Sequence, residues 1–170
     1  RMLRSGALPL RVTHNDTKLN NVLLDEKTGR ARCVLDLDTV MPGLSAHDFG
    51  DAVRFGASSA AEDETELSSV FLRLDLYRAY LEGYLDACGH ALTENEIDVL
   101  PLGAKIITIE LAARFLKDYL DGDLYFKIDR PSQNLDRCRA QLRLAADMEE
   151  KWPQMRTILR ETAASRCGTT

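Results

Sequence analysis

The sequence predicts a mainly helical α+β fold in which a small β-hairpin region precedes a bundle of helices. Within residues 8–38, short apolar runs alternate with turn residues, which is typical of strands. From about residue 66 onward, apolar residues recur at helical spacing. A length of 170 residues corresponds to about one domain. We expect that domain to span residues 1–160, followed by a frayed polar tail over residues 161–170.

Strands are expected over residues 8–13, 21–24 and 30–38. Between the last two, residues 25–29 end in Gly29, which can adopt the positive φ of a hairpin turn. The third strand contains the apolar run Cys33-Val-Leu35, and Asp36-Leu-Asp38 follows it directly. This pattern predicts a buried strand that delivers two carboxylates at its end.

Helical segments make up the rest of the chain. Residues 39–56 are rich in glycine and contain Pro42, so we expect a loop with at most a short helix around residues 47–55. Longer helices are expected over about 66–88, 93–120 and 134–148, the last with an extension to about 159. Thr93-Glu-Asn-Glu96 has the pattern of a capping box, and Pro101 should break or restart the helix that follows. Because apolar residues nearly surround the segment 106–116, we expect that helix to be the buried axis of the bundle.

Composition excludes several classes of protein. The net charge of −5 argues against a nucleic-acid partner, which would require a basic surface. The four cysteines are widely separated, so we expect free thiols in a reducing, cytoplasmic environment. The most apolar stretch, residues 99–120, is interrupted by charged residues such as Lys105 and Arg114, which predicts no membrane association.

The densest group of polar side chains lies on the loop between the first two predicted strands, where His14, Asp16, Lys18 and Asn21 occur within eight residues. Their spacing, H-x-D-x-K-x-x-N, is that of the protein-kinase catalytic loop. Asp16 would orient and deprotonate the acceptor hydroxyl, Lys18 would neutralise charge on the transferred phosphoryl group, and Asn21 would bind Mg²⁺. His14 is expected to pack and hydrogen-bond to backbone, with a role as general base as the alternative.

The remaining metal ligands are expected from the predicted strand end at Asp36, with Asp38 as a second carboxylate. The alternative is that Asp36-Leu-Asp38 is only a turn that ends a strand. Asp48, within His47-Asp-Phe-Gly-Asp51, is expected to be a structural acceptor that holds the catalytic loop.

These three segments together resemble the aminoglycoside phosphotransferase and choline kinase superfamily, which has a protein-kinase-like fold. Within it, the chain is most similar to the N-acetylhexosamine 1-kinases, a likeness that continues through residues 110–120, 122–126 and 134–136. The resemblance implies ATP, Mg²⁺ and phosphorylation of the anomeric hydroxyl of N-acetylglucosamine or N-acetylgalactosamine. An aminoglycoside- or choline-type acceptor is the alternative.

The resemblance also implies sugar contacts from Asp16 and the helical body, where we expect Arg114 and Tyr125 to contribute. For Arg114, a surface ion pair with Glu110 or Asp118 is an equal alternative, because both lie at helical spacing from it. For Tyr125 the alternative is packing in the core.

A kinase also requires an N-terminal lobe with a glycine-rich loop and a strand lysine that hold the phosphates of ATP. Gly6 is the only glycine before Gly29. We therefore expect a kinase-like C-terminal lobe from a longer enzyme, with little or no activity of its own. Its exposed face would be covered by the N-terminal lobe or by self-association. A non-catalytic helical scaffold derived from a kinase is the other open hypothesis.

Overall fold

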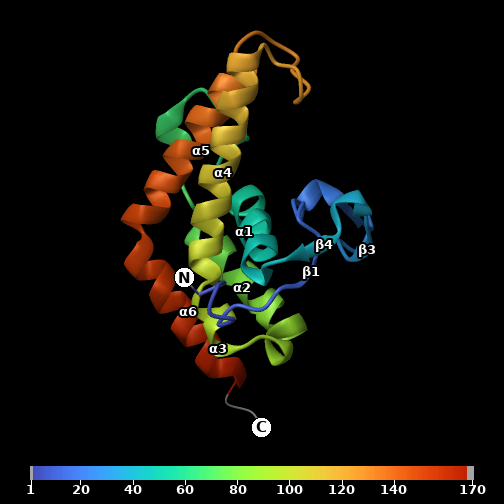
Figure 1. The fold of residues 1–170 in the computed structure, drawn as a ribbon, viewed down its shortest axis with the longest axis vertical. Helices are drawn as coiled ribbons and strands as arrows, with labels where there is room; N and C mark the ends of the chain where they lie inside the picture. The colour runs from blue at the N-terminus through green and yellow to red at the C-terminus, as the bar shows by residue number, and fades with distance from the viewer. Residues whose placement is uncertain (1, 168–170) are drawn as a thin grey trace.

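The computed structural model describes residues 2–167 and confirms a mainly helical α+β fold of the kinase C-terminal-lobe type. A small β region lies to one side of an elongated helical body (Figure 1). The strands are β1 (Arg11–Thr13), β2 (Val22–Leu24), β3 (Ala31–Val34) and β4 (Met41–Gly43). The α-helices are α1 (Ser45–Gly56), α2 (Leu74–Cys88), α3 (Glu94–Asp98), α4 (Leu100–Asp121), α5 (Gln133–Glu150) and α6 (Trp152–Cys167).

The β region consists of two separate two-stranded antiparallel sheets. β1 pairs with β4, with Thr13 opposite Met41, and β2 pairs with β3, with Val22 opposite Val34. Strand β4 was predicted as loop because of its proline and glycine. Pro42 is tolerated there because both strands of a two-stranded sheet are edge strands. One side of β4 has no neighbouring strand, so a proline that lacks an N–H group breaks no hydrogen bond on that side.

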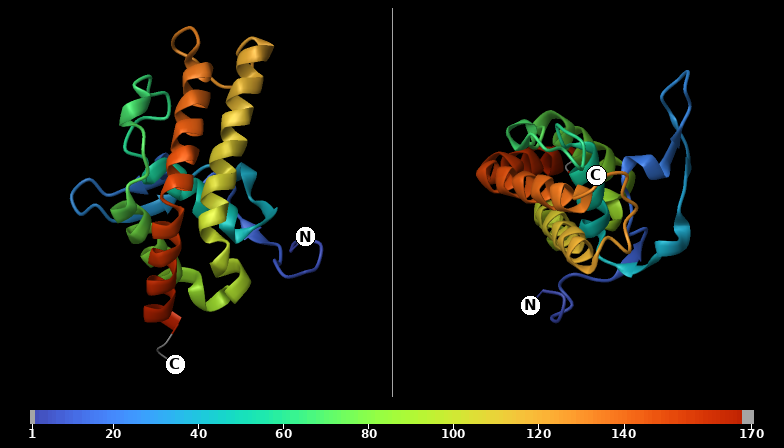
Figure 2. Two further views of the ribbon diagram at one scale, coloured as in Figure 1. Left: turned by 90° about the vertical axis from the view of Figure 1, so that its left-hand side faces the viewer. Right: turned by 90° about the horizontal axis from the view of Figure 1, so that it is seen from above.

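The β2–β3 hairpin differs from its prediction in burial. Its turn ends at Gly29 with φ +66°, as expected, but β3 spans only Ala31–Val34 and is exposed along its whole length. The hairpin pairs only with itself and projects away from the helices (Figure 2, right). The prediction of a buried strand before Asp36 was therefore wrong for the described residues, because no second layer covers the apolar side chains.

The helical body is built around α4, which packs against α1 on one side and α5 on the other. The α1–α4 contact is made at Gly50 and Gly103. A Cβ atom at Gly103 would lie 2.0 Å from the carbonyl oxygen of Ala46, and one at Gly50 would lie 2.6 Å from the carbonyl of Gly103. The two backbones therefore touch with no side chain between them. Figure 2 (left) shows α4 and α5 running side by side beyond this crossing.

The prediction that residues 106–116 form a buried axis was only partly right. α4 is central, but its buried face consists mostly of small residues such as Ala104, Thr108 and Ala112. Ile106 is 44% exposed and Ile109 is 43% exposed. An apolar pattern on several sides of a helix does not identify the side that packs. Here the close approach at the glycines selects the side with small residues.

Two helix boundaries also differ from their predictions. α2 begins at Leu74 rather than near residue 66, because the acidic segment before it makes loop contacts: Glu66 accepts a hydrogen bond from the N–H of Ser68. α6 continues through Cys167, so the frayed tail predicted over residues 161–170 is wrong for 161–167. Thr162 is buried and Arg166 pairs with Asp86 of α2. Residues 168–170 lie outside the described part of the chain.

The residues that start and end helices were predicted correctly where the pattern lies within one helical turn. Thr93 and Glu96 form the expected capping box, Pro101 lies in the first turn of α4, and Gly122 ends α4 with φ +94°. Cys33, Cys88 and Cys138 are free thiols, as expected, while the side chain of Cys167 lies outside the description. Among the described residues, none of the helices is both long enough and apolar enough to cross a membrane.

Candidate active site

The site begins where the two small sheets meet. β1 leads into the loop of residues 14–21, and β3 leads into residues 35–40, which return through β4 to lie beside β1. Several hydrogen bonds join the two loops, among them that from the N–H of Leu35 to the carbonyl of Asn21 (2.8 Å). The hydroxyl of Thr39 donates to the backbone carbonyl of His14 (2.6 Å), and the side-chain amide of Asn15 donates to the backbone carbonyl of Thr39 (3.0 Å). The Nε2 atom of His14 lies 2.9 Å from the carbonyl oxygen of Leu35.

Asp48 joins this loop to the helical body. It lies in the first turn of α1, and its two carboxylate oxygens accept the backbone N–H groups of His14 and Asn15, both at 2.8 Å. Asn15 has φ +64°, a conformation that costs energy for a residue other than glycine. The loop is therefore held in one strained shape by hydrogen bonds to a helix.

Asp16, Lys18 and Asn21 form one cluster on this loop. The Nζ of Lys18 lies 2.9 Å from Oδ2 of Asp16, and the amide nitrogen of Asn21 donates to the same oxygen (2.6 Å) and to the Asp16 carbonyl (2.9 Å). Both side-chain contacts use Oδ2, which leaves Oδ1 of Asp16 available to another donor. The side-chain nitrogen of Asn21 makes both contacts with Asp16, so the side-chain oxygen of Asn21 is the atom left to bind a cation.

Asp36 and Asp38 lie next to this cluster. The carboxyl of Asp38 raises the pKa of Asp36 by hydrogen bonding and by charge repulsion, and the charge of Asp16 adds to the effect. Asp36 itself has φ +62°. Two carboxyls held in contact by a strained backbone favour a shared proton or a cation between them, and hard divalent cations prefer such oxygens.

The structure places no three His, Cys, Asp or Glu side chains of the described residues in position to hold a metal on their own. The amide oxygen of Asn21 and the Asp36–Asp38 pair would together form a partial ligand set. Such a set suits Mg²⁺, which usually keeps waters and takes further oxygens from substrate phosphates. The residues present therefore fit that ion.

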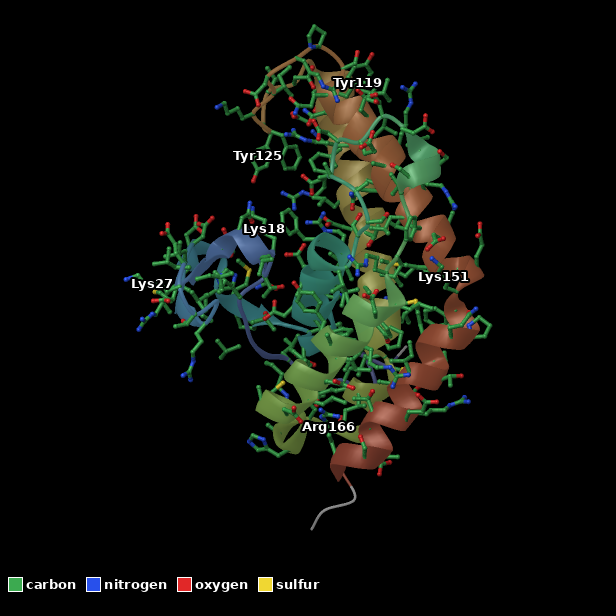
Figure 3. The ribbon with its side chains drawn as sticks, turned by 180° about the vertical axis from the view of Figure 1, so that it is seen from behind. Lys18, Lys27, Tyr119, Tyr125, Lys151 and Arg166 are labelled. Carbon is green, nitrogen blue, oxygen red and sulfur yellow. The ribbon has the colours of Figure 1, made fainter. Side chains whose placement is uncertain are left out.

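A cleft of about 850 Å³ extends from this cluster into the helical body. Its inner end includes Asp16, Lys18 and the Asp36–Asp38 pair. Its sides come from α1 and α4, and the loop between α4 and α5 closes its outer end. Figure 3 shows Lys18 and Tyr125 on opposite sides of this space, each directed toward the other.

The α1 side of the cleft contains a buried ion cluster that the sequence analysis missed. Arg54 is 3% exposed, donates to Oδ1 of Asp51 through Nε (3.0 Å) and Nη2 (2.9 Å), and pairs with Glu62 at 2.6 Å. His47, Asp51 and Arg54 are spaced i, i+4, i+7 along α1, so the short helix expected around residues 47–55 already places them on one face, and that spacing was the signal for the cluster. Glu62 gave no comparable signal, because it reaches the cleft from a loop.

The outer end of the cleft is aromatic and basic. The guanidinium of Arg114 lies 5.7 Å from the ring centre of Tyr125 and 5.5 Å from that of Phe126. Its ion pair with Glu110 is loose, at 3.9 Å, and Asp118 instead binds the following loop. Tyr125 is 74% exposed, so it is not a core residue. Arg114 and Tyr125 thus lie in the same cleft as Asp16, at its opposite end.

One comparison with known proteins bears on this arrangement. The model of the phosphotransferase enzyme family, APH, matches residues 1–90, slightly more than half of the chain. The match includes the loop with Asp16 and Asn21, the Asp36–Asp38 pair and Asp48. It ends before α4, so Arg114 and Tyr125 lie beyond it. The chain belongs to the phosphotransferase enzyme family, within the kinase-like superfamily.

Proposed function

We propose that the chain transfers the γ-phosphoryl group of ATP, with Mg²⁺, to a hydroxyl group of a small molecule. The observation that carries this proposal is the cluster of Asp16, Lys18 and Asn21. Asp16 and Lys18 of this cluster line the inner end of one cleft together with Asp36 and Asp38. Phosphoryl transfer needs a group that orients the acceptor hydroxyl, a cation and metal-binding oxygens, with little covalent chemistry from the protein. This cluster provides all three.

Asp16 would accept the hydrogen of the acceptor hydroxyl at its free Oδ1. As the acceptor oxygen bonds to the γ-phosphorus, the bond from that phosphorus to the β–γ bridging oxygen breaks. The hydroxyl proton passes to Asp16, and ADP leaves. Lys18 and Asn21 hold the carboxylate of Asp16 through Oδ2, so its orientation is set before the acceptor binds. Lys18 would also face the negative charge of the transferred group.

Asn21, Asp36 and Asp38 would hold Mg²⁺, which neutralises phosphate charge when bound. Bringing a cation against Asp36 and Asp38 relieves the repulsion that raises the pKa of Asp36. A negative phosphate placed there without the cation would increase that repulsion. The arrangement therefore favours nucleotide together with metal over nucleotide alone.

The acceptor that we propose is an N-acetylhexosamine, phosphorylated at its anomeric hydroxyl. The outer end of the cleft carries Arg114, Lys127 and Arg137, opposed by Glu110. This positive charge disfavours an aminoglycoside, which carries several ammonium groups. Choline recognition usually relies on open aromatic faces, and Arg114 already lies over Tyr125 and Phe126. Arg114 could donate to the acetamido oxygen, and Tyr125 could contact the sugar ring.

We further propose that a nucleotide-binding lobe packs on the β region. Several exposed apolar side chains occur in this small region, among them Val12, Leu23, Val34 and Leu37, and such exposure favours a protein contact. Titration of residues 1–170 alone with Mg-ATP tests this proposal. We expect weak binding, because the proposed lobe would supply the other wall of the nucleotide site. Tight binding would contradict it.

The acceptor is tested with the full-length protein, ATP and Mg²⁺, and a panel of N-acetylglucosamine, N-acetylgalactosamine, an aminoglycoside and choline. We expect ADP release with the N-acetylhexosamines and a sugar 1-phosphate in the ³¹P NMR spectrum. Asp16→Asn should abolish the signal, and Glu26→Gln, an exposed acidic site in the hairpin turn, should not. Turnover of only choline or the aminoglycoside would contradict the sugar acceptor. Loss of activity in Glu26→Gln would show that the assay reports general damage.

A further inference from the structure

One segment of the loop of residues 122–132, which closes the outer end of the cleft, is held by one buried carboxylate. Asp118 is 5% exposed and lies in the last turn of α4. Its Oδ1 accepts the N–H groups of Leu124 (3.0 Å) and Tyr125 (2.8 Å), and its Oδ2 accepts the N–H of Phe126 (2.9 Å). Three successive backbone donors thus converge on one side chain.

A second buried side chain completes this anchor. Asn134, at the start of α5, is fully buried, and its amide nitrogen donates to Oδ2 of Asp118 and to Oδ1 of Asp123, both at 2.9 Å. Burial alone would raise the pKa of Asp118, but the three backbone N–H groups outweigh it and leave that pKa below its ordinary value. The carboxylate is therefore ionised at neutral pH, with all four donors directed at it.

This anchor determines where Tyr125 lies. With its N–H turned inward to Asp118, the Tyr125 side chain is turned outward and is largely exposed. Its ring contacts are Phe126, with ring centres 4.8 Å apart, and the guanidinium of Arg114. Contacts of this kind on an exposed ring are too weak to fix a loop of this length. The backbone hydrogen bonds to Asp118 fix the Leu124–Phe126 segment. The rest of the loop is held separately, by Arg130 with Asp136 and by Arg137, which donates to the carbonyl of Lys127.

We infer that Asp118 is a positioning residue for acceptor recognition, which acts by fixing the Leu124–Phe126 backbone so that Tyr125 and Arg114 face the cleft together. This inference rests on the proposed function, because it assigns the outer end of the cleft to the acceptor. Asp118 lies outside the group that handles phosphate, so its role should concern binding of the acceptor and not the transfer step.

The test compares Asp118→Asn with Asp121→Asn in the full-length protein. Asp118→Asn replaces one acceptor oxygen with an NH₂ group that faces N–H donors. Asp121→Asn makes the same change three residues later, at the exposed end of α4. Among the described residues, the ion pair of Asp121 is with Lys117. Steady-state kinetics with N-acetylglucosamine give the KM of the acceptor, the KM of ATP and the rate of ATP hydrolysis without acceptor. Amide hydrogen exchange of residues 124–126 reports loop order independently of activity.

For Asp118→Asn we expect the acceptor KM to rise by about tenfold or more, and the 124–126 amides to lose protection. The KM of ATP and the acceptor-free hydrolysis should stay within about twofold of wild type, and Asp121→Asn should match wild type throughout. General unfolding would change all three kinetic values. Asn134→Ser, which removes the side-chain amide of Asn134 but keeps the three backbone donors to Asp118, then provides a milder variant with the same expected pattern. An unchanged acceptor KM beside normal wild-type turnover would overturn this inference alone. If wild type transfers phosphate to no acceptor, the proposed function fails, and the acceptor role of Asp118 fails with it.

Discussion

Replacing Glu96 by Gln tests how the segment that leads into the loop of residues 14–21 is attached to the helical body. Glu96 is 1% exposed and accepts hydrogen bonds from Arg11, Ser45 and Thr93. Arg11 begins β1 and Ser45 begins α1, so a single carboxylate joins the strand before Asp16 to the helix that carries Asp48. The Arg11 guanidinium is the main reason that the pKa of Glu96 falls from 4.5 to about 2.

The size of the effect follows from this pKa. At about 1.4 kcal/mol for each pH unit, the lowered pKa corresponds to about 3 kcal/mol of folding free energy. Because the Arg11 side chain is 36% exposed, solvent screening reduces this value, and we expect Glu96→Gln to lose about 2 kcal/mol at pH 7. The folded-state pKa lies below the unfolded one, so the stabilisation is complete above about pH 4.5 and is lost as pH falls toward 2.

Urea unfolding followed by circular dichroism at pH 7, 5 and 3 measures this difference. The gap between wild type and Glu96→Gln should be the same at pH 7 and 5, and should fall to less than half at pH 3. Glu94→Gln is the matched control, because Glu94 lies in the same turn and is exposed, and it should change stability by less than about 0.5 kcal/mol. A gap that is as large at pH 3 as at pH 7 would refute the reasoning, since the ionised carboxylate could not then be its source.

Three further predictions concern the site and its support. Asp16→Asn should lower kcat by about 10² to 10⁴ while leaving the KM of ATP nearly unchanged, and a kcat within threefold of wild type in an ADP-release assay would remove Asp16 from the mechanism. Asp48→Ala leaves the N–H groups of His14 and Asn15 without their acceptor. We expect a loss of about 2 kcal/mol in urea unfolding, and a loss below about 0.5 kcal/mol would show that water replaces the carboxylate. Gly103→Ala should lower Tm by several degrees because its Cβ would overlap Ala46. Gly83→Ala, where a Cβ meets no atom within 4 Å, should raise Tm slightly, and equal shifts in calorimetry would contradict the close-contact explanation.

The parts of the fold that sequence predicted well depend on neighbours within a few residues. The Thr93–Glu96 capping box and the Gly122 helix end each result from one turn of chain, so their residue types identify them. The grouping of Asp16, Lys18 and Asn21 follows from a fixed spacing on a short loop. That spacing, with the Asp36–Asp38 pair, was enough to indicate the family that the comparison then showed.

The parts that sequence did not predict depend on which elements pack together. The exposure of β3 follows from the absence of a second layer over the hairpin among the described residues, which no pattern within the strand reveals. The persistence of α6 beyond residue 160 depends on its contacts with α2. Arg54 and Arg137 reach the cleft from α1 and α5, and only the three-dimensional arrangement brings them into the cleft that Tyr125 also lines.

The glycine contact between α1 and α4 has a consequence for how acceptor preference can change. Because two main chains touch at Gly50 and Gly103, no substitution there can adjust their spacing gradually. α4 and the loop that follows it extend outward from this fixed contact, so residues from Glu110 to Tyr125 can be exchanged without changing how α1 and α4 meet. Under the proposed function, a change of acceptor should therefore arise from substitutions between Glu110 and Tyr125, with the loop of residues 14–21 left as it is.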